Sequence, residues 1–233
     1  MEIKNPLYKN QGIHVVSSIF TIDKGVCKVL LIQRNNEPFK GKWALVGGAL
    51  YNNEELEEGM IREIKEKTNI ENVQLIPSKN YSKVDRSPVM RMIAVSYIGL
   101  MDIKKANLVT STLKTQNAAW FSIDNIPDLA YDYNEILSDA IELLKTKIVS
   151  SDILMSLYPD GFTLPEIQKV YEAILNKELD RRNFRKKILS LGLIKDTNKL
   201  VKFEGNKPAK LYKFKKNIEN KNVFWLNTFL KRN

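Results

Sequence analysis

The spacing of apolar residues in the first part of the chain predicts strands interrupted by helices. Apolar runs rich in β-branched residues predict strands at 14–22, 27–34, 73–76, 90–101 and 118–123, with a shorter apolar stretch at 43–50. Asp23-Lys24-Gly25 lies between the first two runs and predicts a hairpin turn. An apolar residue recurs at every fourth position from Leu56 to Ile64, which predicts a helix over 54–69. A second helix is predicted over 134–149.

Beyond residue 149 the pattern predicts helices first and strands last. A helical stretch at 150–158 ends before a turn, Pro159-Asp160-Gly161. Thr163 and Asp180 are typical N-cap residues, and the helices that they begin are predicted at 164–175 and 181–191. Two β-like runs follow, at 193–203 and 209–214. Three helices followed by a hairpin are the order of a winged helix, so the predicted fold class is α+β in two domains.

Charge distinguishes the two parts more sharply than composition does. The chain has 233 residues and a formal net charge of +10. Residues 1–147 hold 19 basic and 18 acidic side chains, whereas residues 148–233 hold 18 and 9, a net of +9. A compact and strongly basic second part predicts a module that binds a polyanion. A general enrichment in Lys and Asn is the alternative explanation of this charge.

The rarity of Cys and His excludes several classes of protein. Cys27 is the only cysteine and His14 the only histidine, so an intrachain disulfide, a multi-Cys zinc site and a His-rich metal site are all excluded. No apolar run approaches the roughly 18 residues that a membrane span needs. The first residues lack the charged stretch followed by an apolar stretch that is typical of a signal segment. The sequence therefore predicts a cytoplasmic protein with no membrane partner.

Residues 48–70 carry a spaced motif that resembles the Nudix box. The matching positions are Gly48, Glu54, Arg62, Glu63, Ile64, Glu66 and Ile70. Lys67 stands where the family has the second Glu of a pair, and Asn69 stands where it has Gly. The resemblance implies a Nudix α/β/α sandwich for the first part of the chain.

The departure at Lys67 changes the chemistry expected of the box. In the family, carboxylates on one helix face hold divalent cations that neutralise a diphosphate and activate water. Glu63, Glu66 and Lys67 share one helix face and carry a net charge of −1, where the family pattern gives −3. We therefore expect no intact catalytic set, no required cofactor, and at most weak Mg²⁺ binding by Glu63 and Glu66. A simple i,i+4 pair between Glu63 and Lys67 is the purely structural alternative.

Three further segments resemble the ligand loops of ADP-ribose-type Nudix proteins. Residues 34–45 are similar to the family pattern R…PF.G.WALPGG, which continues with Val46 in place of Pro. Residues 85–91 are similar to an RDPR loop, and residues 129–137 to LAFDH.EIL, with Tyr133 in place of His. The resemblance implies ligand contacts at Arg34, Trp43, Gly48, Arg86, Arg91 and Asp132. A solvated surface charge is the alternative for each Arg, and a core or pocket-wall role is the alternative for Trp43.

The basic second part resembles the C-terminal half of the Nudix-related transcriptional regulators, the NrtR family. The matching pieces are 162–168, 171–174, 180–187 and 207–212, so that the whole resemblance covers about 12–214. On the predicted helix 181–191, Phe184, Ile188 and Leu191 form an inward apolar stripe. Basic residues off that stripe are placed to meet a major groove and its phosphates. The predicted DNA contacts are Thr163, Arg181, Arg182, Asn183, Arg185, Lys186, Lys207 and Lys210.

These resemblances imply a ligand-responsive bacterial transcription factor. The expected domains are a sensing domain at 1–148, a winged helix-turn-helix at 149–216, and a tail at 217–233 that is a candidate dimer contact. Operator DNA, a second copy of the chain, and ADP-ribose or a related NAD-derived nucleotide are the expected partners. Two alternatives stay open, a sugar-responsive regulator of carbohydrate genes and an active ADP-ribose pyrophosphatase.

Overall fold

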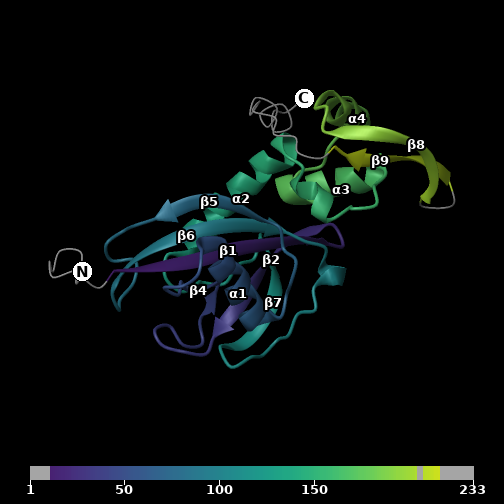
Figure 1. The fold of residues 1–233 in the computed structure, drawn as a ribbon. Helices are drawn as coiled ribbons and strands as arrows, with labels where there is room; N and C mark the ends of the chain where they lie inside the picture. Colours follow the sequence, from purple (N-terminus) through teal and green to yellow (C-terminus); the bar gives the residue numbers. More distant parts are fainter. Residues whose placement is uncertain (1–10, 204–206, 216–233) are drawn as a thin grey trace. The chain divides into compact units, whose positions relative to one another are not determined.

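The computed structural model describes residues 11–203 and 207–215 (Figure 1). The chain divides into two compact units, one within residues 1–21 and 28–140, the other within residues 22–27 and 141–233. Within the described residues, no helix is long and apolar enough to cross a membrane. The proposed dimer-contact tail at 217–233 lies outside the described residues. The boundary at 148/149 stays a prediction.

The first unit is built on a seven-stranded mixed sheet. Its strands are β1 (Gln11–Asp23), β2 (Val26–Arg34), β3 (Trp43–Ala44), β4 (Val46–Ala49), β5 (Leu75–Tyr81), β6 (Arg91–Leu100) and β7 (Thr115–Ser122). The path runs β3-β2-β1-β6-β5, with β4 paired to β1 and β7 paired to β2. β1 and β6 run parallel, and the other registered pairs are antiparallel. The predicted hairpin turn is confirmed, because Lys24 and Gly25 have φ of 50° and 79°, the left-handed pair that tight hairpins favour.

Helix α1 (Leu56–Thr68) packs on this sheet, within the stretch in which the apolar spacing predicts a helix. It contacts β4 and β7 and buries Met60 and Ile64. Its first turn is closed by a capping box between Glu55 and Glu58. Asn69 ends the helix with φ 58°, and Asn is among the few residues besides Gly that adopt this left-handed conformation readily. The departure from the family pattern at Asn69 therefore preserves the helix terminus.

Helix α2 (Tyr133–Ser150) ends where a further helical stretch is predicted. The structure forms only a short 3₁₀ turn there, η2 (Ile153–Ser156), so the prediction of a helix at 150–158 is wrong. Ser150 and Ser151 donate their hydroxyls to the carbonyls of Thr146 and Lys147, a local bond that competes with continued helical pairing.

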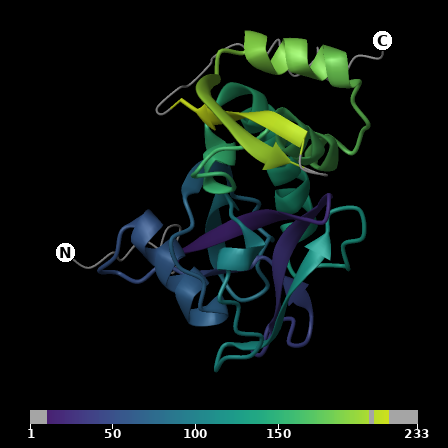
Figure 2. The same cartoon turned by 90° about the vertical axis from the view of Figure 1, so that its right-hand side faces the viewer.

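The second unit contains the predicted helix pair and hairpin (Figure 2). Its elements are α3 (Leu164–Leu175), α4 (Arg181–Ser190), β8 (Ile194–Phe203) and β9 (Lys207–Phe214). β8 and β9 pair antiparallel, and β9 contacts α3. The predicted stripe of Phe184, Ile188 and Leu191 is buried, with Phe184 edge-on to the ring of Tyr171 at 5.3 Å. This packing determines which face of α4 is exposed to solvent.

Candidate functional site

The carboxylate of Glu63 is the centre of the site formed by the box residues. It is 3% exposed, and the Lys67 ammonium lies 2.8 Å from its Oε2. The same ammonium donates to the Gly47 carbonyl. On the other side, Arg62 donates to Glu63 Oε1 at 2.6 Å. Two basic groups therefore neutralise this buried carboxylate from within the protein.

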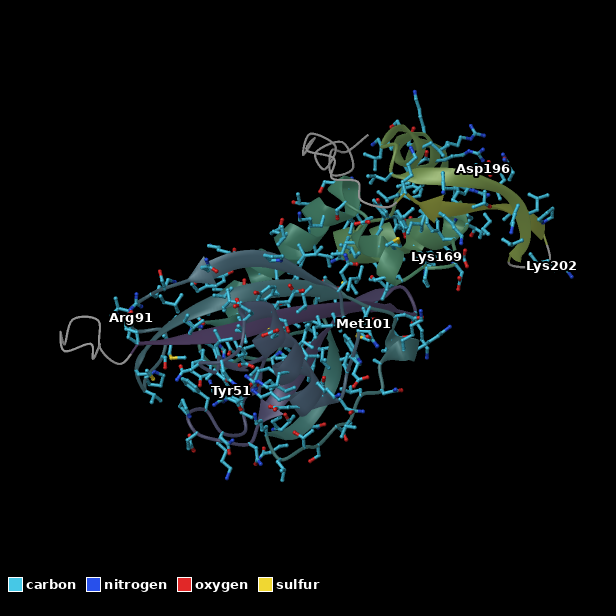
Figure 3. All side chains as sticks on the ribbon, in the orientation of Figure 1. Tyr51, Arg91, Met101, Lys169, Asp196 and Lys202 are labelled. Atoms are coloured by element: carbon cyan, nitrogen blue, oxygen red, sulfur yellow. The ribbon has the colours of Figure 1, made fainter. Side chains whose placement is uncertain are left out.

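The neighbouring carboxylates are paired in the same way. Arg62 makes two bonds to Glu54, of 2.6 and 2.8 Å, and its guanidinium lies over the ring of Tyr51, labelled in Figure 3. Lys114 lies 2.5 Å from Glu66 Oε2, and Arg62 reaches the same oxygen at 3.2 Å. Sequence reasoning missed Lys114, because its partner on α1 lies 48 residues away and no local pattern connects the two.

Gly48 supports this arrangement by having no side chain. A Cβ at this position would lie 2.2 Å from Cδ of Glu63, which is far inside van der Waals contact. Any other residue would displace the Glu63 carboxylate from its partners. The absence of a side chain at Gly48 therefore leaves room for the Glu63 carboxylate. The predicted ligand contact at Gly48 stays a prediction.

The pKa values of the box follow from these pairs. Hydrogen bonds from Arg62 lower the pKa of Glu54 to about 2. Burial raises the pKa of Glu63, but Lys67 and Arg62 outweigh burial and hold it below its ordinary value. Both groups are therefore ionised at neutral pH, with their charges already matched by Arg and Lys.

The fold implies a divalent cation at this position, but the residues present do not fit one. A divalent cation needs several oxygen ligands, and the carboxylates among them must not already be paired with basic side chains. Here the ammonium of Lys67 takes both Glu63 Oε2 and the Gly47 carbonyl. Within the described residues, no group of three His, Cys, Asp or Glu is placed to hold a metal.

The structure does not leave the predicted ligand arginines as free surface charges. The side chain of Arg86 is 2% exposed and makes a bidentate pair with Asp132, of 2.9 and 2.8 Å. Arg91, at the start of β6 in Figure 3, donates to the carbonyls of Ser82 and Lys83. Arg86 and Asp132 are therefore brought together, and Arg91 is engaged by its own loop.

An aromatic cluster lies beside Arg34, and sequence reasoning identified it only in part. Arg34 donates to the Pro38 carbonyl and lies 5.1 Å from the ring centre of Tyr131. Tyr131 also contacts Phe39 and Tyr133, with ring centres 4.8 and 5.3 Å apart. Tyr131 and Phe39 both have positive φ, of 55° and 63°, which local apolar spacing does not reveal.

His14 joins this cluster through Tyr133. The Tyr133 hydroxyl lies 3.3 Å from His14 Nε2, and the two rings stack with centres 6.1 Å apart. Nδ1 of His14 is buried with no hydrogen-bond partner among the described residues. Burial, helped by the charges of Lys67 and Arg86, lowers the pKa of His14 to about 3. The imidazole is therefore neutral at physiological pH.

Trp43 is half-buried and packs against a neighbouring strand. Its ring meets Phe121 edge-on, with centres 4.7 Å apart. Its carbonyl accepts from the Ala130 amide at 2.8 Å, which fixes the segment that leads to Asp132. The predicted ligand contact at Trp43 stays a prediction.

The outer face of α4 has a different character from the box. Asp180 caps the helix by accepting from the Asn183 amide at 2.9 Å. The charged residues that follow are exposed and form no ion pair with another described residue; they are Arg181, Arg182, Arg185 and Lys186. These four basic side chains are therefore available to bind an external anion.

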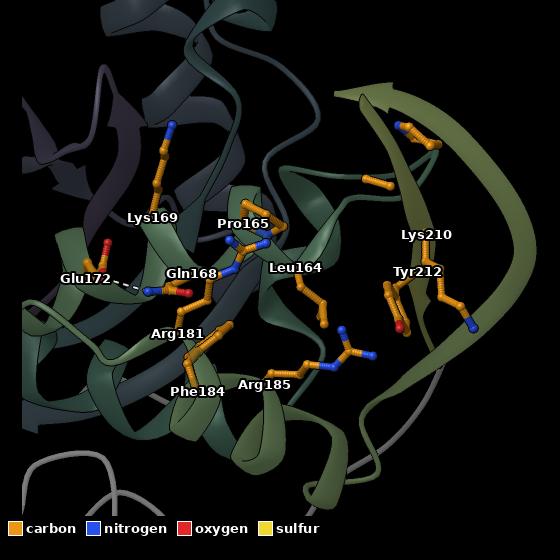
Figure 4. A pocket seen from close by; sticks show the side chains of 12 residues that line it. Leu164, Pro165, Gln168, Lys169, Glu172, Arg181, Phe184, Arg185, Lys210 and Tyr212 are labelled. Carbon is orange, nitrogen blue, oxygen red and sulfur yellow. Dashed lines mark hydrogen bonds between the residues drawn. The ribbon is translucent and has the colours of Figure 1, made fainter. Parts of the chain in front are cut away.

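A groove of about 740 Å³ is lined by residues of α3, α4 and β9 (Figure 4). Apolar side chains form part of its lining, including Leu164, Pro165 and Phe184. Arg185 extends from α4 toward β9, and Lys210 lies on that strand. Gln168 donates to Glu172 at 2.9 Å along the opposite wall.

Two predicted DNA contacts are already engaged within the protein. Thr163 is 1% exposed, and its hydroxyl donates to Glu166 in the capping box of α3. This geometry does not support a direct contact between Thr163 and DNA. Lys210 pairs with Asp196 at 2.7 Å across the hairpin. The side chain of Lys207 lies outside the described residues.

Family models match both parts of the chain. The NUDIX domain model matches residues 12–143, and the NrtR DNA-binding winged helix domain model matches residues 154–214. These matches agree with the mixed sheet of the first unit and with the helix pair and hairpin of the second.

Among known proteins, the chain is 31% identical to the ADPR responsive transcriptional repressor NtrR of Acinetobacter baylyi, over 89% of this chain and 83% of that protein. It is 38% identical to the ADP-ribose pyrophosphatase of Methanocaldococcus jannaschii, over 48% of this chain and 64% of that protein. The crystal structure of Shewanella oneidensis NrtR with a 27mer DNA is 29% identical, with a TM-score of 0.73 over 87% of this chain and 93% of that one. The NUDIX domain of the same protein with ADP ribose is 27% identical, with a TM-score of 0.55 over 60% of this chain and 93% of that one.

Proposed function

Because the chain belongs to the Nudix-related transcriptional regulators of the NrtR family, we propose that it is an ADP-ribose-responsive repressor of transcription. The observation that carries the proposal is the contrast between its charged sites. The basic face of α4 is open to an external anion, whereas the carboxylates of the box are neutralised from within. The exposed basic face serves DNA binding. The paired carboxylates are not free to hold the divalent cation that hydrolysis needs.

Operator DNA is bound through α4 and the hairpin. Arg182 and Arg185 provide bidentate donors for base edges or phosphates, and Lys210 on β9 adds a further positive charge. Helix-turn-helix proteins usually read paired half-sites, so the working form is a homodimer in the cytoplasm. The sensing domain is assigned to 1–148 and the DNA-binding domain to 149–216.

ADP-ribose, or a nucleotide with the same diphosphate, is the effector bound by the Nudix domain. The related NUDIX domain from Shewanella oneidensis was crystallised with ADP ribose, which supports this choice. The effector changes the affinity for operator DNA and is released unchanged. We expect no hydrolysis and no need for a metal cofactor, because Lys67 occupies the Glu63 and Gly47 oxygens that a divalent cation would use in activating water.

One experiment tests these claims together and separates the alternatives. DNA that binds the full chain is selected from a random pool, and its affinity is then measured with and without ADP-ribose. Chromatography of the same samples follows the ADP-ribose. An affinity change with intact ADP-ribose supports the proposal. Magnesium-dependent AMP release would favour the pyrophosphatase alternative suggested by the Methanocaldococcus jannaschii relative. A response to a free pentose but not to ADP-ribose would favour a sugar-responsive regulator.

A further inference from the structure

The box cluster carries no net charge, which is unusual for a site that is built to hold a divalent cation. Its carboxylates are Glu54, Glu63 and Glu66, and its basic groups are Arg62, Lys67 and Lys114. With Glu at position 67, as in the family pattern, the same cluster would carry −2. A cluster at −2 repels a diphosphate unless metal is present, whereas a neutral cluster does not.

The Lys67 ammonium takes the kind of ligands that a divalent cation would take. It contacts one carboxylate oxygen, Oε2 of Glu63, and one backbone carbonyl, that of Gly47. Both are hard oxygen donors, which magnesium and manganese also prefer. Lys67 is 9% exposed, and removing one member of a buried ion pair is strongly unfavourable. The ammonium is therefore a permanent part of the site.

Lys114 completes the arrangement at the open side. It is 39% exposed, and it lies 2.5 Å from Glu66 and 3.9 Å from Glu63. An exposed Lys can exchange a carboxylate partner for a phosphate oxygen at little cost, since surface ion pairs are weak. Lys114 thus supplies a partly exposed positive charge near the same carboxylate that the buried Lys67 contacts.

We propose that Lys67 is a built-in substitute for the divalent cation, so that this domain binds the diphosphate of its effector without metal. Lys67 keeps the cluster neutral from within, and Lys114 contacts the diphosphate directly. This inference rests on the proposed function for the identity of the effector. It does not rest on that function for the absence of metal binding.

The test compares native protein with two full-length variants. Lys67→Glu restores the acidic pattern of the family. Lys65→Glu makes the same charge reversal at an exposed position of α1 that pairs with Glu71, and it is the matched control. Calorimetry measures Mn²⁺ binding without ligand, and then the binding of ADP-ribose and of inorganic pyrophosphate in EDTA and in Mg²⁺.

Native protein and Lys65→Glu should show no Mn²⁺ binding at this site, and their affinity for ADP-ribose should be the same in EDTA and in Mg²⁺. Lys67→Glu should bind Mn²⁺, and its affinity for ADP-ribose in EDTA should fall by about tenfold, equivalent to about 1.4 kcal/mol, with recovery in Mg²⁺. Because a third carboxylate beside buried Glu63 can unfold the domain, Lys67→Gln serves as a second variant. It should weaken metal-free binding of ADP-ribose without creating a Mn²⁺ site.

Each contrary result has one meaning. If native protein binds Mn²⁺ as tightly as Lys67→Glu, or binds ADP-ribose only with Mg²⁺, the inference is wrong and the proposed effector stands. If native protein binds pyrophosphate without metal but does not bind ADP-ribose, the inference holds and the proposed effector is wrong. If neither anion binds in EDTA or in Mg²⁺, both the inference and the proposed effector are wrong.

Discussion

The two units treat charge in opposite ways. In the Nudix unit, charged side chains near the box are buried or half-buried and meet each other, as in the contacts of Glu63 with Arg62 and Lys67. On α4, the side chains of Arg181, Arg182, Arg185 and Lys186 are exposed and form no ion pair with another described residue. The charges of the box are therefore paired within the protein, whereas the basic side chains of α4 are available to an external anion.

This difference predicts opposite outcomes for similar substitutions. Breaking a buried ion pair from one side costs about 3–5 kcal/mol of stability, because the remaining charge is buried without its partner. Removing an exposed charge usually changes stability by less than about 0.5 kcal/mol. Removing a buried, paired positive charge from the Nudix unit should therefore weaken the fold, whereas removing an exposed one from α4 should weaken binding to DNA.

The largest effect is expected from Arg182→Ala combined with Arg185→Ala. Each contact with a base edge is worth about 1–3 kcal/mol, so the double variant should lose about a hundredfold or more in operator affinity. Melting temperature and ADP-ribose binding should be unchanged. Fluorescence anisotropy measured over a range of salt concentrations also reports how many phosphate contacts are lost.

The matched control for this double variant is Lys104→Ala combined with Lys105→Ala, two exposed residues of the Nudix unit. It removes the same charge from the whole chain and should leave operator affinity nearly unchanged. Equal losses in the two double variants would mean that net charge, rather than the face of α4, determines DNA binding.

A second prediction separates Arg86 from Arg34. Arg86→Ala should lower the free energy of unfolding by about 3 kcal/mol, because Asp132 is left without its bidentate partner. Arg34→Ala should change stability much less, because its guanidinium bonds only to carbonyls and lies over a ring. Urea denaturation measures both. Equal stability of the two variants would contradict the structural role given to Arg86.

A smaller effect concerns the single histidine. The pKa of His14 is about 3 in the folded protein and about 6.5 when unfolded, so below pH 6.5 only the unfolded state takes up the proton. Between pH 6.5 and 5 the native protein should lose about 1–2 kcal/mol relative to His14→Gln. The imidazole NMR signal should not shift over this range. A midpoint near pH 6.5 would show that the ring is not held neutral by burial.

Much of the fold follows from local patterns in the sequence. The caps at Thr163 and Asp180, the apolar stripe of α4 and the hairpin turn at Gly25 each depend on residues within one or two turns of each other. The same holds for the pairing of Lys67 with Glu63 at i,i+4. These features, and the fold class, were predictable because the interacting groups are close in the chain.

The remaining features depend on partners far away in the chain. Arg86 meets Asp132 across 46 residues and His14 meets Tyr133 across 119, so neither periodicity nor spacing reveals that these groups are buried together. The loss of the helix at 150–158 depends on serine hydroxyls that bond back to α2. Sequence reasoning identified Arg86 and Asp132 as a site, but only the structure shows that they bind each other.

The most direct test of the account is a titration of ADP-ribose into the complex of the full chain with its selected operator, in EDTA and again in Mg²⁺. The account predicts the same shift in operator affinity in both buffers, with all of the ADP-ribose recovered intact. Release of AMP in Mg²⁺, together with an operator affinity that does not change when ADP-ribose is added, would contradict it. That outcome would identify the Nudix unit as a working hydrolase attached to a separate DNA-binding domain.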